Sequence, residues 1–180
     1  MKHTIHKMFW AWEHEKEEKW LNEMSAKGLQ LISPGPFTYI FEEGPCGEYH
    51  YRLELLNHVP SHPESIAYIR FLEETGIEQI GSYLRWVYFR KKVADGEFDL
   101  YSDLSSKIKH YKLISNLLLA VTPINIFPMI INFSAFIHHR NSVNLFSVLI
   151  SLTISLLLGL GLFKINKKTK HLKKQQLIQE

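Results

Sequence analysis

Two long runs without an ionisable side chain constrain this chain most. Residues 113–137 form a run of 25, and residues 145–163 form a run of 19. A helix needs about 20 apolar residues to cross the hydrocarbon core of a bilayer, so each run is long enough to span it. A buried helical hairpin of a globular protein is the alternative, but the other residues are too few to wrap two such helices. The sequence therefore predicts a two-helix transmembrane hairpin over residues 113–163.

Basic residues flank the two predicted spans unevenly. The link between the spans, residues 138–144, carries only Arg140. Six basic residues lie before the first span and six after the second: Arg90, Lys91, Lys92, Lys107, Lys109, Lys112, Lys164, Lys167, Lys168, Lys170, Lys173 and Lys174. Because lysine and arginine accumulate on the cytoplasmic side, we expect a multi-pass protein of the inner cell membrane. Both termini, including a basic tail over residues 164–180, are then cytoplasmic.

Charge also differs between the two parts of the chain. Residues 1–110 carry 13 Lys/Arg against 17 Asp/Glu, a net of −4, and residues 111–180 carry 8 against 1, a net of +7. The lysines thus accompany the apolar runs, as expected where a protein meets anionic lipid. Since an acidic N-terminal part repels a phosphate backbone, we expect no direct nucleic-acid partner.

Small residues recur every four positions in the second predicted span. They are Ser147, Ser151, Ser155 and Gly159. This spacing places them in one stripe along a helix, and such stripes let two helices approach closely in lipid. The stripe predicts either packing against the first span or a homodimer contact.

Residues 1–94 are predicted to form a small α+β domain. Alternating apolar residues predict strands at residues 4–10, 29–42, 48–56 and 78–90, and Ser33-Pro34-Gly35-Pro36 interrupts the second of these. Helices are predicted at residues 13–27, ended by Gly28, and after a capping box that begins at Ser61. This βαββαβ order is that of a ferredoxin-like domain, with a three-stranded variant if residues 4–10 are not a strand. Residues 95–112 are expected to be a polar connector to the membrane.

One face of the predicted sheet is expected to bind a partner. In a ferredoxin-like domain the helices cover one face, so the other must meet water, a ligand or another protein. The side chains expected there are His50, Arg52, Glu54, Tyr83, Arg85 and Phe89. Aromatic residues with arginine are typical of protein interfaces, which favours a recognition surface. The alternative is that arginine and glutamate on this face only form a cross-strand ion pair that stabilises the sheet.

The sequence shows no spacing typical of catalysis. It has no Gly-rich phosphate loop, no Gly-x-Ser-x-Gly elbow and no His-Glu-x-x-His motif. Of the 10 histidines, His58 and His62 lie on either side of Pro60 and do not share a helix face. We interpret them as solvated loop histidines and expect no metal, no cofactor and no enzymatic activity.

Several N-terminal segments resemble a bacterial family. They are the Phe-Trp-Ala-Trp opening at residues 9–12, residues 15–24, Tyr-Arg-Leu-Glu-Leu at residues 51–55, residues 71–76 and residues 81–91. Together they are similar to the family of domain of unknown function 2812, over about residues 7–110. The resemblance implies a cytoplasmic domain ahead of membrane helices and no established catalytic residues. It also implies a regulatory partnership, because genes of this family often stand beside a PadR-type transcriptional regulator.

Two main hypotheses of function remain open, beside a third, a hydrolase or ligand-modifying enzyme, which needs an acid or nucleophile cluster assembled from residues distant in sequence. The first is a non-catalytic, membrane-anchored regulatory or adaptor protein whose cytoplasmic domain binds a protein partner, with a PadR-type regulator as the candidate. The second is a small membrane protein for transport, envelope-stress resistance or immunity to a membrane-active peptide. Deleting residues 1–100 separates them, because only under the second hypothesis does the bare hairpin retain resistance.

Overall fold

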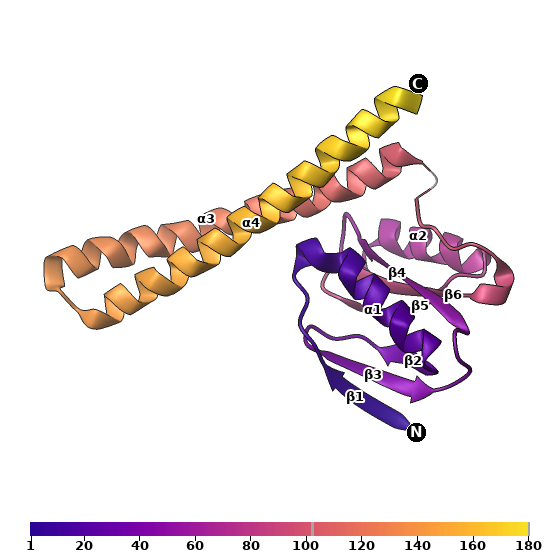
Figure 1. Ribbon diagram of the computed structural model, residues 1–180. Coiled ribbons are helices and arrows are strands. Elements are labelled where there is room, and N and C mark those ends of the chain that lie inside the picture. Colours follow the sequence, from indigo (N-terminus) through magenta and orange to yellow (C-terminus); the bar gives the residue numbers. More distant parts are fainter. Residues whose placement is uncertain (102, 180) are drawn as a thin grey trace. The chain divides into compact units, whose positions relative to one another are not determined.

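The computed structural model describes residues 1–101 and 103–179. The chain divides into two units, Met1–Ser102 and Asp103–Glu180. The first unit is a mixed α+β domain, and the second is a pair of long helices joined by a short link (Figure 1). The mixed α+β class and the helical hairpin are therefore as predicted.

Within its described residues, 1–101, the first unit contains six strands and two α-helices. The strands are β1 (Lys2–His6), β2 (Leu29–Ser33), β3 (Thr38–Glu43), β4 (Tyr49–Leu55), β5 (Glu78–Tyr83) and β6 (Trp86–Lys92). The helices are α1 (His14–Ala26) and α2 (Pro63–Glu74), with short 3-10 helices at Ala11–Glu13 and Val93–Asp95. Both predicted helices are present, and the strand predicted at residues 4–10 is shorter and begins earlier.

The strands form two sheets, not the one that the sequence predicted. Their orders are β1-β3-β2 and β4-β6-β5, and all pairs are antiparallel. The ferredoxin-like topology is thus not confirmed. Residues 29–42 split into β2 and β3 because Pro34 and Pro36 cannot donate hydrogen bonds to a ladder. Residues 78–90 split into β5 and β6 at the two-residue turn Leu84-Arg85.

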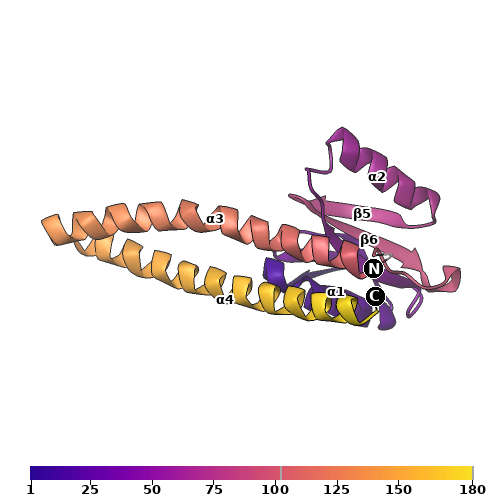
Figure 2. The ribbon, with the colours of Figure 1, turned by 90° about the horizontal axis from the view of Figure 1, so that it is seen from above.

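The sheet β4-β6-β5 has a hydrophobic core on each of its faces. The core on the α1 side contains Leu21, Met24, Leu31, Tyr39, Phe41, Tyr51, Leu53 and Tyr88. The core on the α2 side contains Leu56, Ile69, Leu72, Ile77, Val87, Phe89 and Phe98. Because successive side chains of a strand point to opposite faces, β6 contributes to both. The two helices thus lie on opposite faces of this sheet, not on one face (Figure 2).

Helix α1 also covers the free edge of strand β4. Three of its polar residues, spaced four and three apart, lie on one helix face: Glu18, Asn22 and Ser25. Glu18 Oε1 accepts from Leu53 N at 2.8 Å, and Asn22 Oδ1 accepts from Tyr51 N at 2.9 Å. Ser25 Oγ donates to Tyr49 O at 2.7 Å. Side chains of α1 therefore bond to the backbone of three alternate β4 residues, Tyr49, Tyr51 and Leu53.

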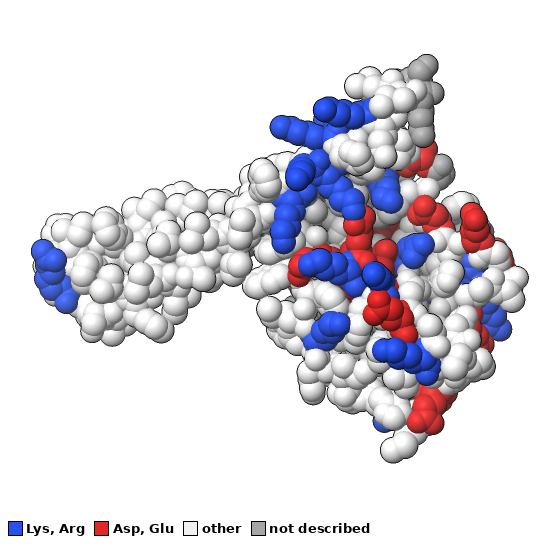
Figure 3. Space-filling model, viewed as in Figure 1, with Lys and Arg blue, Asp and Glu red and all other residues white. Residues whose placement is uncertain are grey.

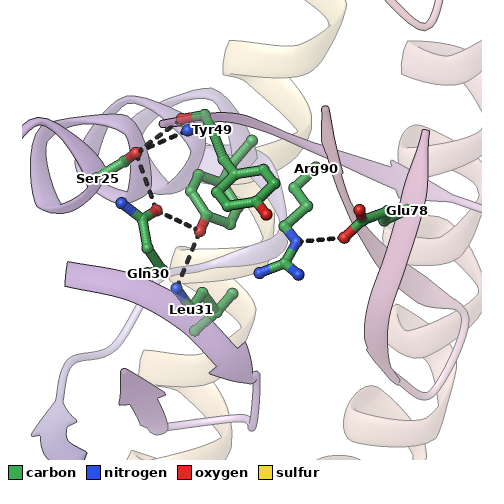
Figure 4. A network of polar contacts seen from close by, with 7 residues as sticks. Ser25, Gln30, Leu31, Tyr49, Glu78 and Arg90 are labelled. Atoms are coloured by element: carbon green, nitrogen blue, oxygen red, sulfur yellow. Dashed lines mark hydrogen bonds and ion pairs between the residues drawn. The ribbon is translucent and has the colours of Figure 1, made fainter. Parts of the chain in front are cut away.

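The hydroxyl of Tyr51 links the two sheets. It accepts a hydrogen bond from Leu31 N of β2 at 3.0 Å and donates to Gln30 Oε1 at 3.0 Å (Figure 4). Burial raises the pKa of this tyrosine. The two sheets also approach each other closely at Pro34, three residues after Leu31. A Cβ on Gly81 of β5 would lie only 2.8 Å from the Pro34 ring. The β2–β3 turn thus packs directly on the β5 backbone.

The second unit is an antiparallel pair, α3 (Leu104–His139) and α4 (Ser142–Gln179). The link shrinks to Arg140 and Asn141, because the residues on either side of these two are helical. Arg140 ends α3 in the left-handed conformation, with φ 51° and its N–H bonded to Phe136 O at 2.8 Å. Residues 104–112 and 164–179, expected as connector and tail, are continuous with the two helices.

Both long helices have the length and composition needed to cross a membrane. In their most apolar 18-residue windows, only 11% of α3 and 6% of α4 is buried within the chain. Figure 3 shows many Lys and Arg side chains at one end of the hairpin and a small basic patch at the link end, with an uncharged surface between them on the face shown. A core helix of a soluble protein would be mostly buried, so this exposure favours contact with lipid.

Candidate functional site

Three of the predicted binding residues, Arg52, Glu54 and Phe89, lie on one face of the sheet β4-β6-β5. Helix α2 covers this face. Arg52 stands opposite Phe89, and Glu54 stands opposite Val87 in the antiparallel register. Phe89 is fully buried, at 0% exposure, in the core on the α2 side. The guanidinium of Arg52 lies 5.9 Å from the centre of the Phe98 ring. An open face made of these residues is therefore absent, because α2 and Phe98 occupy it.

Glu54 connects strand β4 to helix α2 beneath this cover. Tyr68 of α2 donates its hydroxyl to Glu54 Oε2 at 2.8 Å. Burial raises the pKa of Glu54 to about 7, although the Tyr68 hydrogen bond lowers it. Because the side chain is held inside the domain by Tyr68, its protonation is coupled to the packing of α2 on β4.

The three remaining predicted residues lie at two ends of the sheet. His50 is exposed and pairs in register with Lys91. Tyr83 and Arg85 lie at the opposite end, where β5 turns into β6. The structure thus brings Tyr83 and Arg85 together and separates both from His50.

The turn between β5 and β6 has an exposed and strained leucine at its tip. Leu84 has a φ of 55° and is 72% exposed. In a two-residue hairpin this conformation favours glycine, asparagine or aspartate, because a Cβ clashes with the backbone there. Tyr83, next to it, is 40% exposed. We call Tyr83, Leu84 and Arg85 the hairpin tip.

Arg85 fixes the hairpin tip to the end of β4. Its Nε donates to Leu56 O at 2.7 Å, and its carbonyl accepts from Leu56 N at 2.9 Å. Leu84 is therefore presented on a braced hairpin and not on a loose loop. A protruding apolar side chain on a rigid support suits a hydrophobic pocket of another protein.

A buried carboxylate lies on the other side of the domain. Glu17 Oε1 accepts from Tyr39 at 2.7 Å and from Tyr88 at 2.6 Å. Burial raises the pKa of Glu17, and it raises the pKa of both tyrosines as well. Perturbed carboxylates occur at many active sites, but these two hydroxyls tie α1 to β3 and β6. We interpret the cluster as a polar part of the core.

Most of the chain matches a known protein family. Residues 13–122 match the family described as "Protein of unknown function (DUF2812)". The chain belongs to the DUF2812 family. The match begins just before α1 and ends inside the apolar part of α3, so the family segment joins the domain to the start of a long helix. No curated protein and no solved structure matches the chain.

Within the DUF2812 segment, the structure gathers two histidines that the sequence kept apart. The rings of His58 and His62 stack with centroids 4.1 Å apart, and His58 Nε2 lies 3.4 Å from Glu64 Oε2. Sequence spacing could not show this, because the turn at Val59 and Pro60 that brings the rings together is not periodic. The sequence offered one hint of this approach, namely that Pro60 stands between the two histidines.

Only part of the small-residue stripe on α4 contacts α3. Asn125 of α3 donates its Nδ2 to Ser151 O and to Ser155 Oγ, both at 2.8 Å. Ser147 donates instead to Val143 O of its own helix at 3.0 Å. A Cβ on Gly159 would meet nothing within 4 Å. The middle of the stripe thus faces α3 and contacts it through a polar residue.

Proposed function

We propose that this DUF2812 protein is a non-catalytic, membrane-anchored regulatory or adaptor protein. In this proposal α3 and α4 anchor the chain in the inner membrane with both termini in the cytoplasm. The first unit binds a protein partner through the hairpin tip. The observation that carries the proposal is the strained, 72% exposed leucine at position 84.

The strain of Leu84 supports a role outside the folded chain. A non-glycine residue in the left-handed region costs about 1–2 kcal/mol. A side chain that is 72% exposed regains little of this by packing within the domain. Strained residues persist mainly where function retains them, and burial of leucine in a partner's pocket offsets the strain.

A PadR-type transcriptional regulator is the partner that we propose. It is suggested by the family resemblance, and binding it at the membrane would limit the amount free to act on DNA. The anchored hairpin tip offers an apolar contact of the kind that forms the centre of a protein interface. The acidic first part of the chain fits a protein partner better than a nucleic acid.

The test measures the affinity of the full-length chain, reconstituted in lipid nanodiscs, for a purified PadR-type regulator from the same organism. We expect Leu84→Asn to weaken binding by at least about 30-fold, the loss typical of a central interface residue. Asparagine tolerates the left-handed conformation, so the domain should unfold no more easily than the wild type. Phe71→Ala is the matched control, because Phe71 is an exposed aromatic residue on α2.

Two results would contradict the proposal. One is a wild-type chain that does not bind the regulator. The other is a Leu84→Asn chain that binds as tightly as the wild type. A loss of binding in Phe71→Ala together with full binding in Leu84→Asn would move the interface to α2 and overturn the assignment of the hairpin tip.

A further inference from the structure

The loop between β4 and α2, together with the first turn of α2, holds a cluster of side chains that could ligate a metal ion and that the proposed partner binding does not use. The loop supplies His58 and His62, the helix supplies Glu64, and each offers one donor atom. We propose that this cluster binds a divalent transition-metal ion, with Zn²⁺ as the best-fitting ion. The proposal goes beyond the proposed function and does not depend on it.

The donor atoms are close to the spacing that such an ion requires. Four-coordinate zinc binds nitrogen and oxygen at about 2.0–2.2 Å, which places neighbouring donors roughly 3.4 Å apart. His58 Nε2 and Glu64 Oε2 are already 3.4 Å apart. All three donor atoms lie within 4.8 Å of one another. A rotation of the His62 ring, which now stacks on His58 at an interplanar angle of 19°, completes the set.

The backbone of the loop is held in a defined shape. His62 N donates to Val59 O at 2.9 Å, which closes a turn around Pro60. Ser65 Oγ donates to His58 O at 3.4 Å and ties the start of the loop to α2. Proline also fixes φ at two positions, Pro60 and Pro63. The loop therefore brings the two histidines together before any ion binds.

The donor set selects the class of ion. Two imidazoles with one carboxylate suit zinc, nickel and copper, whereas calcium and magnesium prefer oxygen donors alone. The side chains of His58 and Glu64 are 46% and 76% exposed, so water can fill the remaining coordination positions. Glu64 also supplies the negative charge that offsets a cation beside the N-terminus of α2.

Ion binding competes with the cap of α2. His62 Nδ1 now accepts a hydrogen bond from Glu64 N at 3.3 Å. An imidazole that accepts at Nδ1 carries its proton on Nε2, so binding an ion through either nitrogen breaks this bond. Because this hydrogen bond is long, losing it costs little, and the coordinate bond to the ion replaces it.

The experiment uses the full-length chain in detergent micelles, purified with a tag that lacks histidine. Titration with Co²⁺, followed by visible absorption, and with Zn²⁺, followed by calorimetry, should show one site per chain. We expect the His58→Ala/His62→Ala double variant to lose affinity by more than about 100-fold, because even outer contacts are worth 10- to 100-fold. Glu64→Gln should weaken binding and shift the Co²⁺ spectrum.

Matched controls are the double variants His3→Ala/His6→Ala and His138→Ala/His139→Ala, which remove paired histidines elsewhere. Both should bind like the wild type. The proposal fails if the wild type does not take up either ion, or if the His58→Ala/His62→Ala variant binds as the wild type does. It also fails if affinity is lost only when His138 and His139 are replaced. Tryptophan fluorescence of each variant shows that it remains folded.

Discussion

The side-chain amide of Asn22 makes two hydrogen bonds to the backbone of Tyr51. Its Oδ1 accepts from the Tyr51 N–H at 2.9 Å, and its Nδ2 donates to the Tyr51 carbonyl at 3.2 Å. A neighbouring antiparallel strand would bond the same two groups in this way. Helix α1 thus takes the position of a further strand and closes an edge that could otherwise pair with another chain.

Asn22→Ala should therefore destabilise the first unit. It leaves the N–H of Tyr51 without its partner, whereas the Tyr51 carbonyl keeps the bond from Arg52 Nη1 at 3.2 Å. The lost bond lowers the free energy of unfolding by about 1–3 kcal/mol. Urea titration of the full-length chain in micelles measures this by tryptophan fluorescence. All four tryptophans lie in the first unit, so the signal reports that unit alone.

Glu23→Ala is the control for this measurement. Glu23 is exposed on the same helix, so its replacement should change the unfolding free energy by no more than about 0.5 kcal/mol. Equal stabilities of the Asn22→Ala and Glu23→Ala chains would show that α1 does not hold the β4 edge through this amide.

Glu54 should make the stability of the first unit fall as pH rises. Burial raises its pKa from an ordinary value of 4.5 to about 7 in the folded chain. The folded state therefore holds this proton more tightly than the unfolded state. The stabilisation is complete below the ordinary pKa and is lost as pH rises through about 7. The loss amounts to about 3 kcal/mol.

Replacing the carboxyl isolates this contribution from those of other groups. Glu54→Gln should exceed the wild type in stability at about pH 8, and the difference should vanish near pH 4.5. Tyr68→Phe removes the hydrogen bond that lowers the pKa of Glu54, so the transition should move to higher pH. A difference between wild type and Glu54→Gln that is constant across this pH range contradicts the prediction.

Asn125→Ala should weaken the pairing of α3 with α4. The variant loses the hydrogen bonds to Ser151 O and Ser155 Oγ, and interhelical bonds of this kind contribute about 0.6–2 kcal/mol in a membrane. In a Cys46→Ser chain, pyrene labels on Ser115→Cys and Asn166→Cys report the pairing by excimer emission during titration with SDS. The label sites suit this because Ser115 Oγ and Asn166 Oδ1 are 3.4 Å apart.

Asn132→Ala serves as the matched variant. Asn132 Nδ2 donates to Pro128 O of its own helix at 2.8 Å and not to α4. The midpoint of the SDS titration should therefore move less than in Asn125→Ala. If the SDS midpoint shifts equally in both variants, the hydrogen bonds of Asn125 to α4 do not contribute to the pairing of the helices.

The native cysteine provides a test of membrane orientation. Cys46 is exposed in the first unit and is the single cysteine of the chain. With the termini in the cytoplasm, a membrane-impermeant maleimide should label it only after cells are permeabilised. In a Cys46→Ser chain, a cysteine placed at Asn141 should react in intact cells. Labelling of Cys46 in intact cells would reverse the proposed orientation.

The sequence predicted those elements whose signal is local. Gly28 marks the end of α1, periodic apolar positions mark α1 and α2, and two long uncharged runs mark the helices of the hairpin. The capping box predicted at Ser61 was wrong, because the N-cap of α2 is His62, which accepts from Glu64 N. The break between β5 and β6 was missed because Leu84 stands where a turn favours glycine or asparagine. The run Tyr-Leu-Arg-Trp therefore has the pattern of one continuous strand.

The candidate site depended on contacts that are distant in sequence. Arg52, Glu54 and Phe89 share a face, as alternation along β4 and β6 predicted. Their cover could not be predicted, because it depends on which face of the sheet receives α2. Likewise, the approach of His58 to His62 follows from a turn whose shape no spacing rule describes.

The two long helices do not end where their uncharged runs end. Helix α3 begins nine residues before its apolar run, and α4 continues for sixteen residues beyond its own. In the proposed membrane-anchored state, these helical extensions let the pair shift along the membrane normal when the bilayer thickens or thins, without breaking a helical turn at the interface.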